Sequence, residues 1–89
     1  MRRALPTGAF RRDLRRLLKR GWDLEKLSEV ISTLQNNSSL PPSARPHLLG
    51  GKWVGCWDCH IAGDWVLIYE IAKNEIRLHR TGTHADLFD

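Results

Sequence analysis

Residues 53–88 read WVGCWDCHIAGDWVLIYEIAKNEIRLHRTGTHADLF, and this stretch decides the fold of the chain. Its centre, residues 66–71, is a near-continuous apolar run rich in β-branched side chains, which is typical of a strand buried on both faces. We predict flanking strands at residues 52–61 and 75–83, because the links between the three segments are short enough for hairpin turns. The stretch therefore predicts an antiparallel meander.

Two amphipathic segments precede the meander. Apolar side chains recur at helical spacing within residues 9–19 and again within residues 24–35. The two stripes consist of Phe10, Leu14, Leu17 and Leu18 in the first segment, and Leu24, Leu27, Val30, Ile31 and Leu34 in the second. Thr7 and Asp23 are suited to cap the two helices, and Gly21 to end the first. We expect a helical hairpin whose apolar side covers the sheet.

The chain is expected to form one domain over residues 1–89, of the α+β class. Its N-terminal helical hairpin would pack on an antiparallel sheet of three or four strands. Residues 36–46 (NNSSLPPSARP) lack periodicity and predict a loop that crosses from the helices to the sheet. With 89 residues the core is modest, so a partner that buries more surface would stabilise the protein.

Basic residues are concentrated in the first half of the chain. Residues 1–45 carry ten Lys and Arg against four Asp and Glu, whereas residues 46–89 carry four against six. Six of the basic residues lie within residues 11–20. They are either the solvated face of a helix or a surface for a polyanion or an acidic partner.

The sequence also indicates the cellular compartment of the protein. It contains no apolar run long enough for a membrane span, and its first residues, MRRALPTGAF, lack the apolar centre of a signal peptide. We therefore expect a cytoplasmic protein without membrane partners, with Cys56 and Cys59 as reduced thiols.

Several separated segments of the chain resemble one family in register. They are Trp53-Val54-Gly55, Asp58-Cys59-His60-Ile61, Asp64-Trp65-Val66-Leu67-Ile68-Tyr69 and Arg80-Thr81-Gly82-Thr83-His84-Ala85-Asp86-Leu87-Phe88, with His47 upstream. Together they resemble the YafQ-type branch of the RelE/ParE toxins, small toxins of bacterial type II toxin–antitoxin pairs. The resemblance implies a RelE/ParE-like fold that begins with a short edge strand, which here would fall at residues 2–5.

The resemblance also implies an activity: ribosome-dependent cleavage of mRNA. Without a metal, the ribose 2′-hydroxyl attacks the adjacent phosphorus, so one group takes its proton and another protonates the departing 5′ oxygen. Imidazoles suit both tasks because they titrate near neutral pH. The family makes His84 the first choice for general acid or base, with His60 and His47 assisting and Asp64 orienting a histidine. No cofactor or metal is implied.

Three further residues complete the predicted site. Arg80 would stabilise the phosphorane, Phe88 would stack on a base, and Asp58 would partner His60. Each has a structural alternative as well: Asp64 as a turn cap, Arg80 in a bridge to Asp58 or Asp86, and Phe88 as a core residue.

Side-chain alternation predicts where these groups point. Asp58 and His60 share one face of their strand. Arg80 has the parity of the apolar positions in its strand, so we expect it at the strand end, where it leaves the core. His79 has no counterpart in the family and is expected at the surface. Trp57 stands where the family commonly has a basic residue.

The resemblance further implies partners: a cognate antitoxin, the ribosome and mRNA, and operator DNA only through the antitoxin complex. Two other functions stay open. One is a ParE-like toxin that inhibits a protein target without cutting nucleic acid, a branch that generally lacks these histidines. The other is an inactive relative that retains the fold.

One motif suggests different chemistry. Cys56-Trp57-Asp58-Cys59-His60 matches the C-x-x-C-H attachment pattern of c-type haem, and its thiols and imidazole are zinc ligands. Alternation puts Cys56 and Cys59 on opposite faces of a strand, so joint ligation would require the strand to bend.

Overall fold

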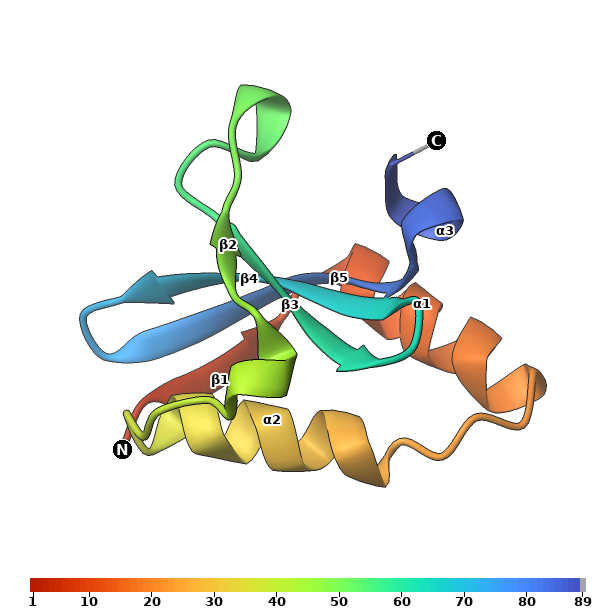
Figure 1. The fold of residues 1–89 in the computed structure, drawn as a ribbon, viewed down its shortest axis with the longest axis horizontal. Helices are drawn as coiled ribbons and strands as arrows, with labels where there is room; N and C mark the ends of the chain where they lie inside the picture. Colours follow the sequence, from red (N-terminus) through yellow and green to blue (C-terminus); the bar gives the residue numbers. More distant parts are fainter. Residues whose placement is uncertain (89) are drawn as a thin grey trace.

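A computed structural model describes residues 1–88, in which one mixed sheet carries two long helices on one of its faces (Figure 1). In chain order the elements are β1 (Arg3–Pro6), α1 (Gly8–Lys19), α2 (Glu25–Gln35), a 3-10 turn (Pro42–Ala44), β2 (His47–Leu48), a second 3-10 turn (Gly51–Trp53), β3 (Trp57–Ala62), β4 (Trp65–Ala72), β5 (Glu75–Thr83) and α3 (His84–Phe88). The predicted α+β class is confirmed, with both helices before the meander. Within residues 1–88, no helix has the length and apolarity to cross a membrane.

The sheet has five strands, more than the three or four expected, in the order β1-β5-β4-β3-β2. The edge strand expected at residues 2–5 is present as β1, but it pairs parallel to β5. All other pairs are antiparallel. The parallel pair follows from the connection between the two strands. Only a tight hairpin forces neighbouring strands to be antiparallel, whereas β1 is followed by two helices that cross one face of the sheet, so it can pair parallel to β5.

The strand predicted at residues 52–61 is shorter than expected. Gly51 and Gly55 have positive φ angles of 61° and 88°, and the chain there folds into a turn that continuous pairing would not allow. The Leu49 N–H donates to the Cys56 carbonyl at 2.9 Å, which closes a β2–β3 hairpin. His47 therefore lies on a short strand opposite Asp58.

The helix boundaries follow capping chemistry. Thr7 caps α1 as predicted, because its Oγ1 accepts from the Phe10 N–H at 3.0 Å, and Gly21 follows the helix with φ of 80°. Helix α2 begins one residue later than predicted. Asp23 accepts from the Glu25 N–H at 2.9 Å, but Leu24 occupies the cap position.

The core has two parts, one on each face of β4. The helix-facing part includes Phe10, Leu17, Leu27, Leu34, Cys59, Trp65, Leu67, Tyr69, Ile76 and Leu78. The smaller part on the opposite face consists of Cys56, Val66, Ile68 and Leu87. Both faces of β4 are thus covered over its first five residues, as its apolar run predicts. Leu18 does not join the predicted α1 stripe and is exposed.

An irregularity in β5 changes its side-chain parity. Tyr69 lies opposite Leu78, and Ile68 lies opposite Arg80, so His79 is an extra residue between two paired positions. Leu78 faces the helices, whereas Arg80 is paired to a residue of the other face. The expectation that Arg80 sits at the strand end is wrong, because the bulge reverses its parity three residues before β5 ends.

Candidate active site

Two of the predicted histidines meet at one end of the sheet. The rings of His60, on β3, and His84, the first residue of α3, have centroids 5.7 Å apart. The His84 Nδ1 lies 2.6 Å from the Asp64 Oδ1 in the β3–β4 turn. Phe88 is one helical turn after His84, with ring centroids also 5.7 Å apart. These four residues, hereafter the His84 cluster, come from two separated stretches of the chain, residues 60–64 and 84–88.

Helix α3 is anchored by a reciprocal cap. The Thr83 N–H donates to the Asp86 carboxylate at 3.0 Å, and the Asp86 N–H donates to Thr83 Oγ1 at 3.1 Å. Arg20, at the end of α1, binds the same carboxylate at 2.9 and 3.1 Å. Arg20 and then the Thr83 bonds hold the pKa of Asp86 well below its usual range. The chain therefore ends in a capped helix up to Phe88, and Asp89 lies outside the described residues.

The remaining predicted residues form a row across the same face of the sheet. His47, Asp58, Ile68 and Arg80 are register partners on β2, β3, β4 and β5, and directly opposite residues share a face. His47 Nδ1 lies 3.6 Å from the Asp58 Oδ1. Asp58 lies opposite Ile68 and His60 opposite Val66, and both partners belong to the smaller core cluster, which confirms the predicted common face of Asp58 and His60.

Two buried polar atoms in this region lack a hydrogen-bond partner within residues 1–88: Asp58 Oδ1 and His60 Nδ1. Buried polar atoms in folded proteins are normally bonded. Asp58 lies beside His47, and His60 lies beside His84. A bound substrate could therefore supply the hydrogen-bond partners that these two atoms lack.

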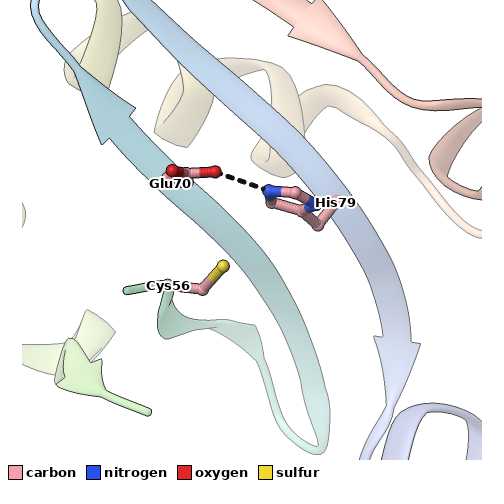
Figure 2. A group of neighbouring side chains, drawn as sticks. All are labelled: Cys56, Glu70 and His79. Carbon is pink, nitrogen blue, oxygen red and sulfur yellow. Dashed lines mark hydrogen bonds and ion pairs between the residues drawn. The ribbon is translucent and has the colours of Figure 1, made fainter. Parts of the chain in front are cut away.

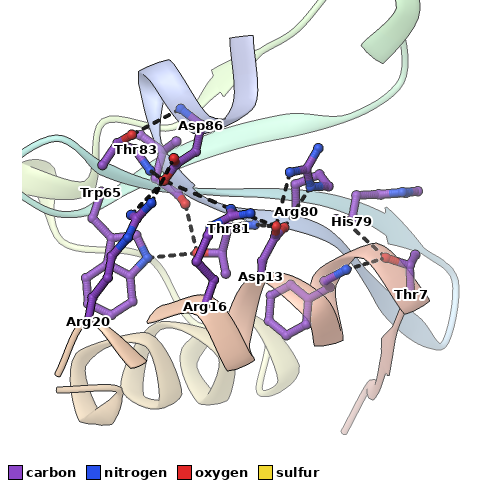
Figure 3. A network of polar contacts seen from close by, with 12 residues as sticks. Thr7, Asp13, Arg16, Arg20, Trp65, His79, Arg80, Thr81, Thr83 and Asp86 are labelled. Atoms are coloured by element: carbon purple, nitrogen blue, oxygen red, sulfur yellow. Dashed lines mark hydrogen bonds and ion pairs between the residues drawn. The ribbon is translucent and has the colours of Figure 1, made fainter. Parts of the chain in front are cut away.

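Arg80 is held by a carboxylate that the sequence reasoning missed. Its Nε and Nη2 donate to the Asp13 carboxylate at 2.7 and 3.0 Å, and the Thr81 N–H donates to it at 3.1 Å (Figure 3). Asp13 also accepts from Arg16 and is only 2 % exposed. The hydrogen bond to Asp13 raises the pKa of Arg80 above its usual value. The proposed bridges from Arg80 to Asp58 or Asp86 are therefore wrong.

A sequence signal for Asp13 did exist. It is the one acidic residue among the six basic residues of residues 11–20, and it falls one turn before Leu17 on the buried side of α1. A carboxylate on the buried side of a helix requires a cationic partner. What the sequence does not give is the identity of that partner, 67 positions away.

The cysteines lie on opposite faces, as alternation predicts. Cys59 is fully buried in the helix-facing core, and Cys56 is in the smaller cluster on the other face. Both are free thiols, and burial raises the pKa of Cys59 to about 12. A joint Cys56–Cys59 metal or haem site has no support in this geometry. Trp57 packs against the helix-facing core, away from the histidine face.

Solved structures share this architecture over the whole chain. YafQ from Escherichia coli BL21(DE3) superposes with a TM-score of 0.93 at 37% identity, covering 100% of both chains. A copper-bound mutant toxin from Helicobacter pylori gives a TM-score of 0.93 at 38% identity, covering 99% of this chain and 100% of its own. The DinJ–YafQ complex of E. coli contains a chain with a TM-score of 0.91 at 38% identity, covering 100% of both. The fold is thus that of small bacterial toxins.

Sequence comparison gives the same result. A family model described as the YafQ bacterial toxin of type II toxin–antitoxin systems matches residues 2–89. The mRNA interferase toxin YafQ of E. coli K12 is 40% identical over 83 residues, which is 92% of this chain and 90% of that relative. The chain belongs to the YafQ toxin family, and the family predicted from the sequence is confirmed.

Proposed function

We propose that the protein is an endoribonuclease that cuts mRNA on the ribosome, without a metal ion, by attack of a ribose 2′-hydroxyl on the adjacent phosphorus. The observation that supports this most directly is the pairing of His60 and His84, with ring centroids 5.7 Å apart. The reaction needs a base and an acid on two sides of one phosphorus, and two neighbouring imidazoles can supply both. Related proteins named mRNA interferases support the same activity.

His84 is the first candidate for proton transfer. Asp64 accepts a hydrogen bond from His84 Nδ1 at 2.6 Å, which leaves Nε2 to exchange a proton with the RNA. A carboxylate on one imidazole nitrogen fixes the ring orientation and stabilises the imidazolium when it forms. His84 acts as the general base or acid, and Asp64 orients it.

His60 and His47 supply the second proton-transfer group and a phosphate contact. Asp58 lies beside both, opposite His47 in register and two residues before His60. Its buried oxygen is an acceptor for an imidazole N–H, so it can hold either ring once substrate has drawn that ring inward.

Arg80 and Phe88 complete the proposed site. Because Nε and Nη2 of Arg80 bind Asp13, a phosphate contact would come from Nη1. Guanidinium near the phosphorane offsets its growing negative charge. Phe88 is 41% exposed beside the His84 ring, so its face is available for an unstacked base.

The proposed partners follow from the same activity. A domain of 89 residues has little surface with which to hold and distort mRNA alone, which favours cleavage on the ribosome. The E. coli relative is known in complex with DinJ, and we propose that a cognate antitoxin covers the basic helix face and the histidines here. Operator DNA would be bound only through that antitoxin complex.

The test is induced expression of wild type beside His84→Ala, with mapping of mRNA 5′ ends on translated messages. Wild type is expected to arrest growth and to cut within codons, whereas His84→Ala folds but does neither. His79→Gln is a matched control, since His79 lies outside the His84 cluster, and it should cut like wild type. Equal growth arrest by wild type and His84→Ala, with no cut ends, would favour the ParE-like inhibitor instead.

A further inference from the structure

A second group of side chains with metal-binding chemistry lies away from the His84 cluster. Cys56 precedes β3, Glu70 is on β4 and His79 is on β5. Each residue offers one ligand atom: a thiol sulfur, a carboxylate oxygen and an imidazole nitrogen. These three atoms lie within 4.8 Å of one another. Figure 2 shows the three side chains close together, with the Glu70 carboxylate directed at the His79 ring. Cys56 belongs to the smaller core cluster with Val66, the register partner of His60, so the group lies on the face of the sheet that carries His60.

Local structure holds each member of this group in place. His79 is the bulge residue of β5, and its ring packs edge-on against Trp53 with centroids 5.9 Å apart. Glu70 is held from both sides, by His79 Nε2 at 3.0 Å on one oxygen and by the Arg77 guanidinium at 3.4 Å on the other. Cys56 is fixed by its N–H bond to the Trp53 carbonyl at 2.9 Å.

We propose that Cys56, Glu70 and His79 bind a zinc-like divalent transition metal ion. Thiolate, imidazole and carboxylate are the zinc ligands of proteins, whereas calcium and magnesium prefer oxygen alone. Zinc–ligand bonds of about 2.0–2.3 Å put neighbouring donors of a tetrahedral site about 3.5 Å apart. The three ligand atoms therefore need to close by only about 1 Å, and a water molecule completes the fourth position.

The charges of the site balance on binding. Burial, and next the Glu70 carboxylate, raise the pKa of the Cys56 thiol, so the free protein holds this sulfur as a thiol. Binding of the dication to the Glu70 carboxylate and the neutral His79 ring displaces the thiol proton, and one proton is released per ion. Arg77 stays on the second carboxylate oxygen and orients it.

The consequence is a cross-link rather than a step in RNA cleavage. The ion would join the turn before β3 to the paired strands β4 and β5 and so add a side-chain link to their backbone ladder. Because only the folded chain brings the three ligands together, bound metal stabilises the fold by mass action.

Cobalt(II) titration of the full chain tests the proposal, because a thiolate bound to cobalt gives an intense near-ultraviolet charge-transfer band. Wild type is expected to show this band at one ion per chain, and equimolar zinc should displace it and raise the melting temperature. Cys56→Ala should lose the band, whereas Cys59→Ala, the matched thiol on the opposite face, should keep it. His79→Gln should weaken cobalt binding at least tenfold.

Three results would overturn the proposal: cobalt binding by wild type without the band, a band that survives Cys56→Ala, or a band lost in Cys59→Ala while that variant stays folded. RNA cleavage is not a readout of this experiment, so its outcome is independent of the proposed function. Cobalt binding by the histidines of the His84 cluster produces no thiolate band and is thereby distinguished.

Discussion

Two carboxylates, Asp64 and Asp13, bind predicted catalytic side chains, and they differ strongly in burial. The Asp64 side chain, on His84, is 62% exposed, whereas that of Asp13, on Arg80, is 3% exposed. An exposed ion pair contributes about 0–1 kcal/mol to stability. Breaking a buried pair leaves a charge without its partner and costs far more. We therefore expect the same kind of contact to orient His84 in one place and to stabilise the fold in the other.

Replacing Asp64 by Asn should slow cleavage while leaving stability unchanged. The amide cannot stabilise a charged His84 ring, so we expect cleavage by saturating enzyme to fall roughly tenfold or more, within the range of a general acid–base contribution. The melting temperature should stay within about 2 °C of wild type, since the pair is exposed. An unchanged cleavage rate would remove Asp64 from the mechanism.

Replacing Asp13 by Asn should destabilise the fold by about 3 kcal/mol. The substitution turns one acceptor into a donor that faces Arg80 and the Thr81 N–H, which are both donors. Urea unfolding measures the change. Asp23→Asn is the control, because the exposed Asp23 Oδ1 accepts from the Glu25 N–H and an amide oxygen can accept the same bond; an equal loss in both variants would contradict the role of Asp13.

At the level of secondary structure, α3 carries His84 and Phe88 but has only five residues, so its cap decides where they point. The cap depends on Gly82. A Cβ at this position would lie 2.9 Å from the Asp86 carboxylate, and the residue has a φ of 156°. Any side chain here must displace Asp86 from the Thr83 N–H.

Gly82→Ala should therefore impair cleavage far more than it impairs folding. A displacement of His84 of about 1 Å is expected to slow the reaction about 100-fold. The sheet should persist in circular dichroism, since the change lies at the end of β5. Gly50→Ala is the matched control, because nothing lies within 4 Å of a Cβ there; equal activity of the two variants would contradict the proposed dependence.

The ion pair between Arg20 and Asp86 makes the stability of the fold depend on pH. The pKa of Asp86 is lowered in the folded state, so its contribution is fully present above the unfolded pKa of about 3.9 and is lost as the pH falls below it. At pH 7, Asp86→Asn should melt about 5 °C below wild type, equivalent to about 1 kcal/mol in a domain of this size. This gap should shrink as the pH falls below about 4. A gap that is constant with pH would mean that the charge of Asp86 does not matter.

For the molecule as a whole, the sequence predicted the parts that depend on local patterns. Helices, hairpins and the two-sided burial of β4 follow from periodicity, and the shared face of Asp58 and His60 follows from alternation. The β5 bulge, the parallel β1 and the Asp13–Arg80 pair could not be derived, because each depends on contacts between distant segments. The family likeness, not periodicity, singled out His84.

The long-range contacts also explain how a small chain assembles its site. Helix α1 binds the final third of the chain through Asp13 and Arg20, which hold Arg80 and Asp86. The N-terminal half thereby supplies the charges that position groups of the C-terminal half. Five of the six basic residues within residues 11–20 are exposed. Arg20 binds Asp86, and the other four, Arg11, Arg12, Arg15 and Lys19, could bind an acidic partner or RNA.

The most direct measurement is the chemical identity of the RNA ends left on translated mRNA, with a chelator present that is selective for transition metals and leaves the Mg²⁺ of the ribosome in place. Attack by the 2′-hydroxyl with histidine proton transfer predicts a 2′,3′-cyclic phosphate on the upstream fragment and a 5′-hydroxyl on the downstream fragment. Wild type should produce both ends in chelator, and His84→Ala should produce neither. Fragments that carry 5′-phosphate and 3′-hydroxyl ends, or cleavage that the chelator abolishes, would contradict the metal-free histidine mechanism.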